Sequence, residues 1–185
     1  MLEFAVILLP VMAFIALVAG LIVVFRGTSR IAARTRELQR FRGAVKDLAS
    51  RVDTSLDSAA SRIDAVRHQQ AGPETIGQTV VDATEALERY GEEARALRGP
   101  RRAQAIRDDF VAEIERANRA LGMVEHGANM LASSRRGSRE LEAQTSIKRG
   151  YLNLIHAREA VARHAVVAED LRMEEPASER PRFGV

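Results

Sequence analysis

The stretch from residue 38 to residue 66 reads LQRFRGAVKDLASRVDTSLDSAASRIDAV, and its apolar residues recur at steps of three and four. This spacing places them on one face of an α-helix, whereas a half-buried strand would alternate apolar and polar residues. The pattern predicts a coiled-coil seam with one stutter near Val52 to Leu56, where two steps of four follow each other. The predicted seam consists of Leu38, Phe41, Val45, Leu48, Val52, Leu56, Ile63 and Val66.

Two glycine–proline pairs predict where this helix ends and where later helices begin. In Gly72–Pro73 and again in Gly99–Pro100, the glycine suits the end of one helix and the proline suits the first turn of the next. Such short joints favour antiparallel neighbours. Gly137–Ser138 offers a weaker break, with a bent continuous helix as the alternative. We therefore predict helices over residues 26–71, 73–98, 100–136 and 138–172.

The fold class follows from these segments. Apolar residues recur with helical spacing in each of them, and the segments are far longer than the average helix of about 11 to 12 residues. The sequence predicts an all-α protein, built as an elongated, coiled-coil-like antiparallel bundle of three to four long helices. Residues 173–185 contain two prolines, mixed charges and few apolar residues, which predicts a disordered tail.

The last predicted helix has an unusually wide apolar face. One row includes Ile147, Leu154 and Val161, and an adjacent row consists of Leu152, Ile155, Ala162 and Val166. A face of this width predicts a helix that packs against two neighbours.

A glycine in the middle of the same helix costs about 1 kcal/mol relative to alanine. It indicates either a close approach of another helix or simply a core helix with one unfavourable residue. If the body has a surface for a partner, we expect it here. The candidate partner surface consists of Gly150, Tyr151, His156 and Arg158.

Basic residues gather on the N-terminal side of the seam. Residues 26–51 hold eight arginines or lysines against two acidic residues, although the net charge of the whole chain is only +3. The remainder of the chain is therefore slightly acidic, which argues against a nucleic-acid-binding body. The predicted membrane-surface basic residues are Arg26, Arg30, Arg34 and Arg36.

An uncharged apolar segment precedes this basic stretch. Residues 4–25 read FAVILLPVMAFIALVAGLIVVF. A helix of this length spans roughly 33 Å, enough for a hydrocarbon core of about 30 Å. The segment has no basic residue before it and no small-residue cleavage pattern after it, which disfavours a signal peptide. It predicts a single transmembrane helix over residues 4–25, preceded by a short external N-terminus at residues 1–3.

The arginines that follow the apolar segment predict its orientation. Positive residues collect on the cytoplasmic side of a membrane span. We therefore expect a single-pass protein of the plasma membrane, with its N-terminus outside and its C-terminal body in the cytoplasm. The first partner implied is the lipid bilayer itself.

No catalytic arrangement is evident in the sequence. The chain has no cysteine and no glycine-rich phosphate-binding motif, and its four histidines form no pattern typical of metal binding. We predict no enzyme activity, no cofactor, no metal site, no small-molecule substrate and no nucleic-acid partner. The sequence favours a membrane-anchored scaffold or assembly protein that acts through helix–helix association, as a homo-oligomer or with another membrane or cytoplasmic protein. The alternative is a regulatory or signalling subunit of a membrane complex.

Overall fold

The computed structural model describes the backbone of residues 2–133 and 139–171, and the side chains of Leu17 and of residues 33–133 and 139–171. Four α-helices account for nearly all of the described residues, and no strand occurs among them. The helices are α1 (Leu2–Arg67), α2 (Ile76–Ala96), α3 (Arg101–Ser133) and α4 (Glu140–Asp170), with a short 3-10 turn, η1 (Pro73–Thr75), before α2. The predicted all-α class is confirmed.

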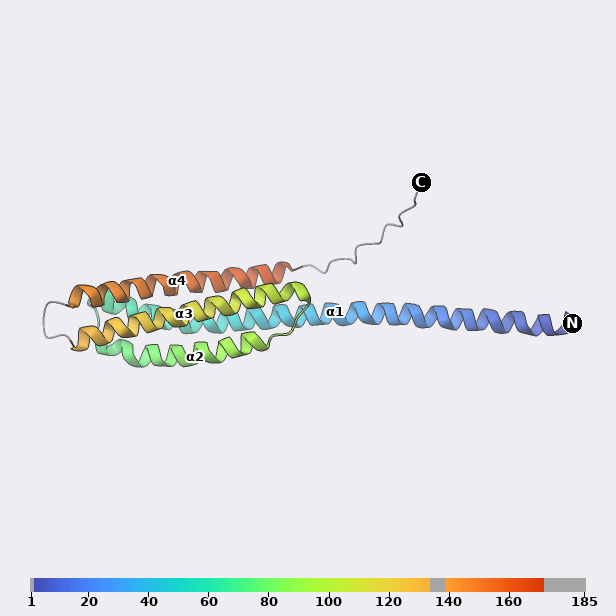
Figure 1. Cartoon of the computed structure of the whole chain (residues 1–185), viewed down its shortest axis with the longest axis horizontal. Helices are drawn as coiled ribbons and strands as arrows, with labels where there is room; N and C mark the ends of the chain where they lie inside the picture. The colour runs from blue at the N-terminus through green and yellow to red at the C-terminus, as the bar shows by residue number, and fades with distance from the viewer. Residues whose placement is uncertain (1, 134–138, 172–185) are drawn as a thin grey trace, which may run out of the picture.

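The four helices form an elongated antiparallel bundle (Figure 1). Each helix packs against its neighbours in sequence, and α4 closes the ring against α1. Within the described residues, α2 and α4 make no contact and therefore occupy opposite corners. The chain runs up and down, so the end of α1 and the start of α2 lie beside the end of α3 and the start of α4 (Figure 1).

Helix α1 is much longer than the bundle. Its N-terminal part runs clear of the other three helices as a single rod (Figure 1). In the described residues of this helix, burial begins at Leu38 and recurs to Val66, so only the C-terminal part of α1 contributes to the core. The predicted apolar segment, basic stretch and seam thus follow one another on one uninterrupted helix.

The core is apolar and rich in small residues. No polar or charged side chain among the described residues is buried. Phe41 and Phe110 are the largest fully buried side chains, and alanines fill many of the remaining positions on all four helices. Burial of each large side chain contributes about 1.5 to 3 kcal/mol, whereas the alanines allow the helix axes to approach closely.

The joint between α1 and α2 closes with a left-handed residue. Gln69 has a φ of 58°, its backbone N–H donates to the Val66 carbonyl at 3.0 Å, and the Gln70 N–H donates to the Ala65 carbonyl at 2.8 Å. This pattern is a Schellman cap, which usually places glycine at the left-handed position. Gln69 therefore holds a conformation that costs an L-residue about 1 to 2 kcal/mol.

The joint between α2 and α3 uses glycine for a different reason. A Cβ atom on Gly99 would lie 2.9 Å from Cδ2 of Phe41 and 3.0 Å from Cβ of Ala103. Only glycine lets the chain pass this close to the ring of Phe41. The α2–α3 loop thereby covers the end of the core from which α1 leaves the bundle (Figure 1).

No helix within the described part of the chain is both long enough and apolar enough to cross a membrane. The transmembrane helix predicted over residues 4–25 falls, apart from Leu17, on residues whose side chains lie outside those described. The structure therefore does not support this helix as a membrane span, and it stays a prediction. The predicted break at Gly137–Ser138 and the predicted tail at 173–185 also lie outside the described residues.

Candidate functional site

The predicted coiled-coil seam lies inside the protein's own bundle. All eight of its residues are buried, from Leu38 at 5% exposure to Val66 at 8%. Helices α2 and α4 pack against this part of α1 and cover the seam. The apolar face that we expected to associate with other chains is thus already occupied, and a second copy could use it only if the bundle opened.

Arg158, from the predicted partner surface, joins α4 to α1. Its Nε donates to Asp53 at 2.5 Å and its Nη1 donates to Asp57 at 2.7 Å. The two aspartates are one helical turn apart, so they present both carboxylates to one guanidinium. The hydrogen bond that Arg158 donates to Asp53 is the main cause that raises the pKa of Arg158. Arg158 is therefore engaged within the chain and is not free to bind a partner.

Gly150 is not on the surface, which corrects its assignment to a partner site. It is buried in α4 against α3, where a Cβ atom would lie 2.6 Å from Cγ2 of Val124 and 2.8 Å from the carbonyl oxygen of Ala120. Gly127 of α3 has the reciprocal position, with a Cβ atom 2.8 Å from the carbonyl oxygen of Ala143. The two glycines let the backbones of α3 and α4 come into direct contact.

The other two residues of the predicted surface differ in environment. Tyr151 is half-buried, and the guanidinium carbon of Arg67 lies 4.3 Å from the centre of its ring. His156 is exposed, with its Nδ1 4.0 Å from a carboxylate oxygen of Glu159. Of the four predicted residues, only His156 is freely accessible.

A polar cluster joins α1 to α2. Arg51 donates to both carboxylate oxygens of Glu93, at 3.2 and 2.5 Å, and its guanidinium carbon lies 5.2 Å from the centre of the Tyr90 ring. The hydrogen bond from Arg51 is the main cause that lowers the pKa of Glu93, and the same bond raises the pKa of Arg51. All three side chains lie near the surface, so this cluster stabilises the helix pair only modestly.

The basic stretch lies on the part of α1 that leaves the bundle. Arg34 and Arg36 are exposed. Arg26 and Arg30 belong to the same helix, but their side chains lie outside the described residues. Because Arg26, Arg30 and Arg34 are spaced by four, they share one face of the helix.

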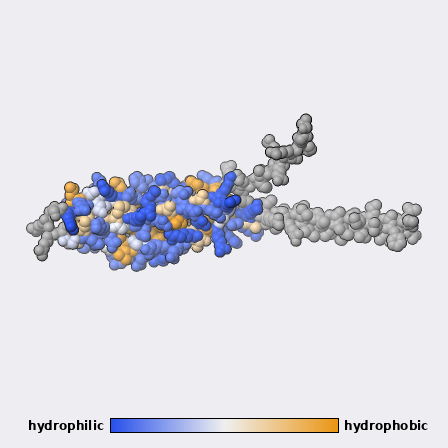
Figure 2. Space-filling model, viewed as in Figure 1, coloured by the Kyte–Doolittle hydropathy of each residue, from blue (hydrophilic) through white to orange (hydrophobic). Residues whose placement is uncertain are grey.

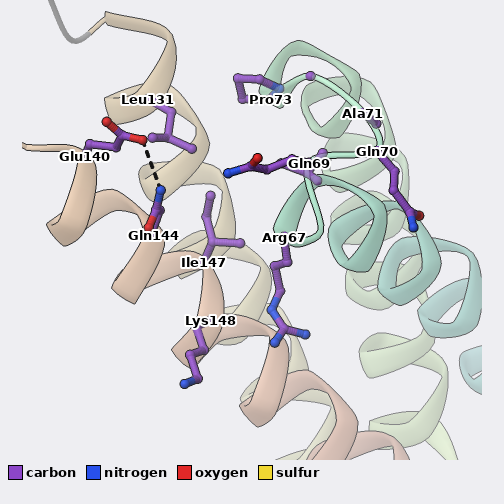
Figure 3. A pocket seen from close by; sticks show the side chains of 12 residues that line it. Arg67, Gln69, Gln70, Ala71, Pro73, Leu131, Glu140, Gln144, Ile147 and Lys148 are labelled. Atoms are coloured by element: carbon purple, nitrogen blue, oxygen red, sulfur yellow. Dashed lines mark hydrogen bonds between the residues drawn. The ribbon is translucent and has the colours of Figure 1, made fainter. Parts of the chain in front are cut away.

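A hollow lies at the end of the bundle farthest from the start of α1 (Figure 3). It measures about 630 Å³ and lies between the α1–α2 joint and the first turns of α4. Gln69 points from the joint toward Leu131 and Ile147, and Glu140 accepts a hydrogen bond from Gln144 at 3.1 Å (Figure 3). The lining mixes glutamines, one acid and two bases, and it brings no nucleophile next to a base.

Within the described ranges, no three acidic or histidine side chains gather where they could hold a metal ion. The adjacent carboxylates Asp108 and Asp109 are both exposed, and Asp108 accepts hydrogen bonds from Arg107. What the geometry offers instead is a helical body with a charged surface and a long helix that extends from one end.

One feature of the surface was missed by reasoning from sequence. Leu152 and Val166, which belong to the second apolar row of α4, are exposed to 45% and 59%. Leu141 and Val167 of the same helix are exposed to 77% and 50%. The wide apolar face indicated a second intramolecular neighbour, but α1 and α3 cover the row with Ile147, Leu154 and Val161, and of the second row only Ile155 is partly buried against the core.

Comparison with known proteins adds no assignment, since neither a protein-family model, nor a curated protein, nor a solved structure matches this chain.

Proposed function

We propose that this protein is a single-pass membrane-anchored scaffold, whose helical bundle stands on the cytoplasmic side of the plasma membrane. Residues 4–25 would form the anchor, with the N-terminus outside. Their fifteen leucine, isoleucine, valine and phenylalanine residues favour insertion by about 5 to 9 kcal/mol. The bundle would act by binding other proteins through its outer helix faces, without catalysis.

The observation that carries this proposal is the continuity of α1. One helix runs from Leu2 to Arg67 and so joins the uncharged segment, the arginines and the bundle core without a break. A helix that leaves a bilayer keeps its backbone hydrogen bonds satisfied on both sides of the boundary. The exposed side chain of Leu17, at 64%, is compatible with contact to lipid.

The same continuity would hold the bundle at a defined height. Leu38, the first buried core residue among the described side chains, lies twelve positions after Arg26. At about 1.5 Å per residue, this spacing places the start of the bundle core roughly 18 Å beyond Arg26. Arg26 and Arg30 would lie within a Debye length, about 8 Å, of the anionic lipid surface, where each contributes about 1 kcal/mol.

The surface of the bundle suits a protein that works in water beside a membrane. The face in view is mostly hydrophilic, with isolated hydrophobic spots (Figure 2). The exposed ion pairs Lys46–Glu169 and Arg95–Glu115 bridge neighbouring helices and leave charged groups outward. A scaffold needs such a soluble body, with limited apolar areas kept for binding.

Membrane fractionation of a double variant tests the anchor. In Ile15→Arg with Val18→Arg, two central arginines cost about 5 to 7 kcal/mol, which offsets most of the insertion energy. We expect the full-length chain to stay with membranes after alkaline extraction and the double variant to appear in the soluble fraction. The matched control is Val81→Arg with Leu141→Arg, which places the same two charges at positions that are exposed in the bundle. This control variant should stay in the membrane fraction.

Crosslinking of the full-length protein in native membranes, followed by mass spectrometry, tests the role of the bundle. A scaffold of identical copies yields crosslinks between copies of this chain. A single dominant heterologous partner would instead indicate the regulatory or signalling subunit. Recovery of neither, from a chain that is folded and membrane-bound, would contradict the proposed scaffold.

A further inference from the structure

The exposed apolar side chains of the bundle concentrate on one helix. Leu141, Leu152, Val166 and Val167 all belong to α4 and are at least 45% exposed. Only Val81 of α2, at 42%, joins them among the large apolar residues described in the bundle. Scattered exposed apolar residues are normal on a protein surface, but their gathering on one element indicates a binding face.

Leu141, Leu152 and Val166 share the outward face of α4, and Val167 lies beside this face. At about 100° per residue, Leu141, Leu152 and Val166 lie within about 40° of one another around the helix. Buried Leu154 and Val161 point to the opposite side, toward α1 and α3. The outward row therefore faces away from the other described helices, so that another helix can approach it.

The outward row follows a heptad pattern. Leu152, Glu159 and Val166 are seven residues apart, and half-buried Ile155 and exposed Ala162 interleave with them at steps of three and four. The same steps continue toward the start of α4 through Lys148, Thr145 and Leu141. A repeat of this kind is the pattern with which one helix packs along another in a coiled coil.

We propose that this row binds the same row of a second copy of the chain, with the two α4 helices antiparallel. A two-fold axis between Leu152 and Ile155 places each of these residues opposite the other in the second copy. The same register places Leu141 opposite Val166 at both ends. Each copy thus presents the same surface, as a two-fold interface requires.

Charge selects the antiparallel arrangement. In this register Lys148 of one copy lies opposite Glu159 of the other, twice in the pair. Within the described residues, Lys148 has no ion-pair partner, and the Glu159 carboxylate reaches only Arg163 at 3.9 Å and His156 at 4.0 Å. A parallel pair in register would place lysine against lysine and glutamate against glutamate, which repel.

The two ends of α4 also complement each other in shape. A hollow of about 520 Å³ near the start of α4 is lined by Leu141 together with Met123 and Met130 of α3. The apolar pair Val166 and Val167 projects near the end of α4. Antiparallel pairing brings these valines to the methionine-lined hollow of the other copy, and methionine adapts well to such contacts.

This pairing rests on the proposed role of helix–helix association, but it does not depend on the membrane anchor. It has a geometric consequence where the anchor is present. Helix α1 leaves the bundle from one end only (Figure 1). In an antiparallel pair the two α1 helices leave at opposite ends, so anchored copies would join two apposed membranes rather than neighbours in one membrane.

Disulfide crosslinking of the full-length chain in detergent tests the pairing directly, because the chain has no cysteine of its own. We expect Lys148→Cys combined with Glu159→Cys to form covalent dimers under mild oxidation. Each single-cysteine variant should form at least tenfold less covalent dimer than the double variant. The two positions lie roughly 16 Å apart along one helix, so a disulfide between them must join two copies. No dimer from the double variant, or strong dimers from either single variant, would overturn the antiparallel pair.

Charge reversal provides a second readout without cysteines. Lys148→Glu should abolish the dimer in sedimentation, and adding Glu159→Lys should restore it. The matched control is Glu85→Lys, an exposed acid on α2 outside the row, which should leave the dimer unchanged. A double reversal that stays monomeric while folded would contradict the assigned register.

Clustering of proteoliposomes separates this inference from the anchor. We expect vesicles that carry the full-length chain to cluster, and those that carry Lys148→Glu to remain dispersed. A chain that crosslinks in detergent but does not enter vesicles would refute the proposed anchor and keep the pairing. A chain that enters vesicles but forms no crosslink would refute the pairing alone.

Discussion

The α3–α4 and α1–α2 interfaces hold the same bundle together by different means. At α3–α4, Gly127 and Gly150 bring backbone against backbone, and any Cβ atom there would meet a carbonyl oxygen at 2.8 Å. At α1–α2, larger side chains fill the space, and Arg51 reaches across to Glu93. The α3–α4 interface requires that no side-chain atom stands between the two backbones, whereas the side chains at α1–α2 can adjust their positions. Substitutions that add or remove a few atoms should therefore affect the stability of the two interfaces differently.

The largest expected effect is from a single methyl group at the close interface. Gly150→Ala should destabilise the bundle by about 1 to 3 kcal/mol, because the backbone of α3 cannot move aside as a side chain can. Gly122→Ala is the matched control on α3, since a Cβ atom there meets nothing within 4 Å. It should stabilise the protein by up to about 1 kcal/mol. Denaturant unfolding followed by circular dichroism measures both, and equal responses would contradict the difference between close and open positions.

The next effect concerns the interface between α1 and α4, where charges replace close packing. Arg158→Ala should destabilise the bundle by about 1 to 2 kcal/mol, because Asp53 and Asp57 lose their shared partner. Arg163→Ala, which removes only a contact of 3.9 Å on the exposed side of α4, is the control and should change little. The same unfolding experiment compares them. If Arg163→Ala lost as much stability as Arg158→Ala, the ion pairs between Arg158 and the aspartates of α1 would not be the cause of the loss.

A smaller change, in the opposite direction, is expected where α1 turns toward α2. Gln69→Gly should stabilise the protein by about 1 kcal/mol, because glycine adopts the left-handed conformation without steric cost. Gln70→Gly, one residue later in the same loop, lacks this benefit and serves as the control. Thermal unfolding should show a higher Tm for the first variant only. A lower Tm for Gln69→Gly would indicate that the glutamine side chain stabilises the joint.

The smallest effect is electrostatic and depends on pH. Because Arg51 lowers the pKa of Glu93 in the folded state, the pair stabilises the protein above the unfolded pKa of about 4.3. This contribution is lost as the pH falls through the lower folded pKa. Glu93→Gln should therefore cost about 0.5 kcal/mol at pH 7, and the difference from the unmodified chain should vanish at strongly acidic pH. If the difference in stability between Glu93→Gln and the unmodified chain grew as the pH falls, the stabilising role of the Arg51–Glu93 pair would be contradicted.

Much of the fold can be predicted from local pattern. The steps of three and four from Leu38 to Val66, and the prolines after Gly72 and Gly99, indicate helices and their antiparallel order. Local pattern does not reveal which helix covers which face. The seam of α1 was expected to bind other chains, yet α2 and α4 fill it, because an apolar stripe packs equally well against helices of its own chain.

The candidate surface was harder to predict, for the same physical reason. Gly150 indicated a close helix approach, which is present, but the approaching helix is α3 rather than another protein. Leu152 and Val166 were assigned to a second internal neighbour and are exposed. Helical period gives the angular position of a residue, whereas exposure depends on how many neighbours surround the helix.

Cysteine labelling in intact cells tests the central claim, that α1 crosses the membrane and leaves the bundle in the cytoplasm. The chain contains no cysteine, so Leu2→Cys and Ser61→Cys each report one position, the latter on the exposed side of α1 within the bundle. With a membrane-impermeant maleimide, we predict that Leu2→Cys is labelled in intact cells and that Ser61→Cys is labelled only after lysis. Labelling of both positions only after lysis, or of Ser61→Cys in intact cells, would contradict the account.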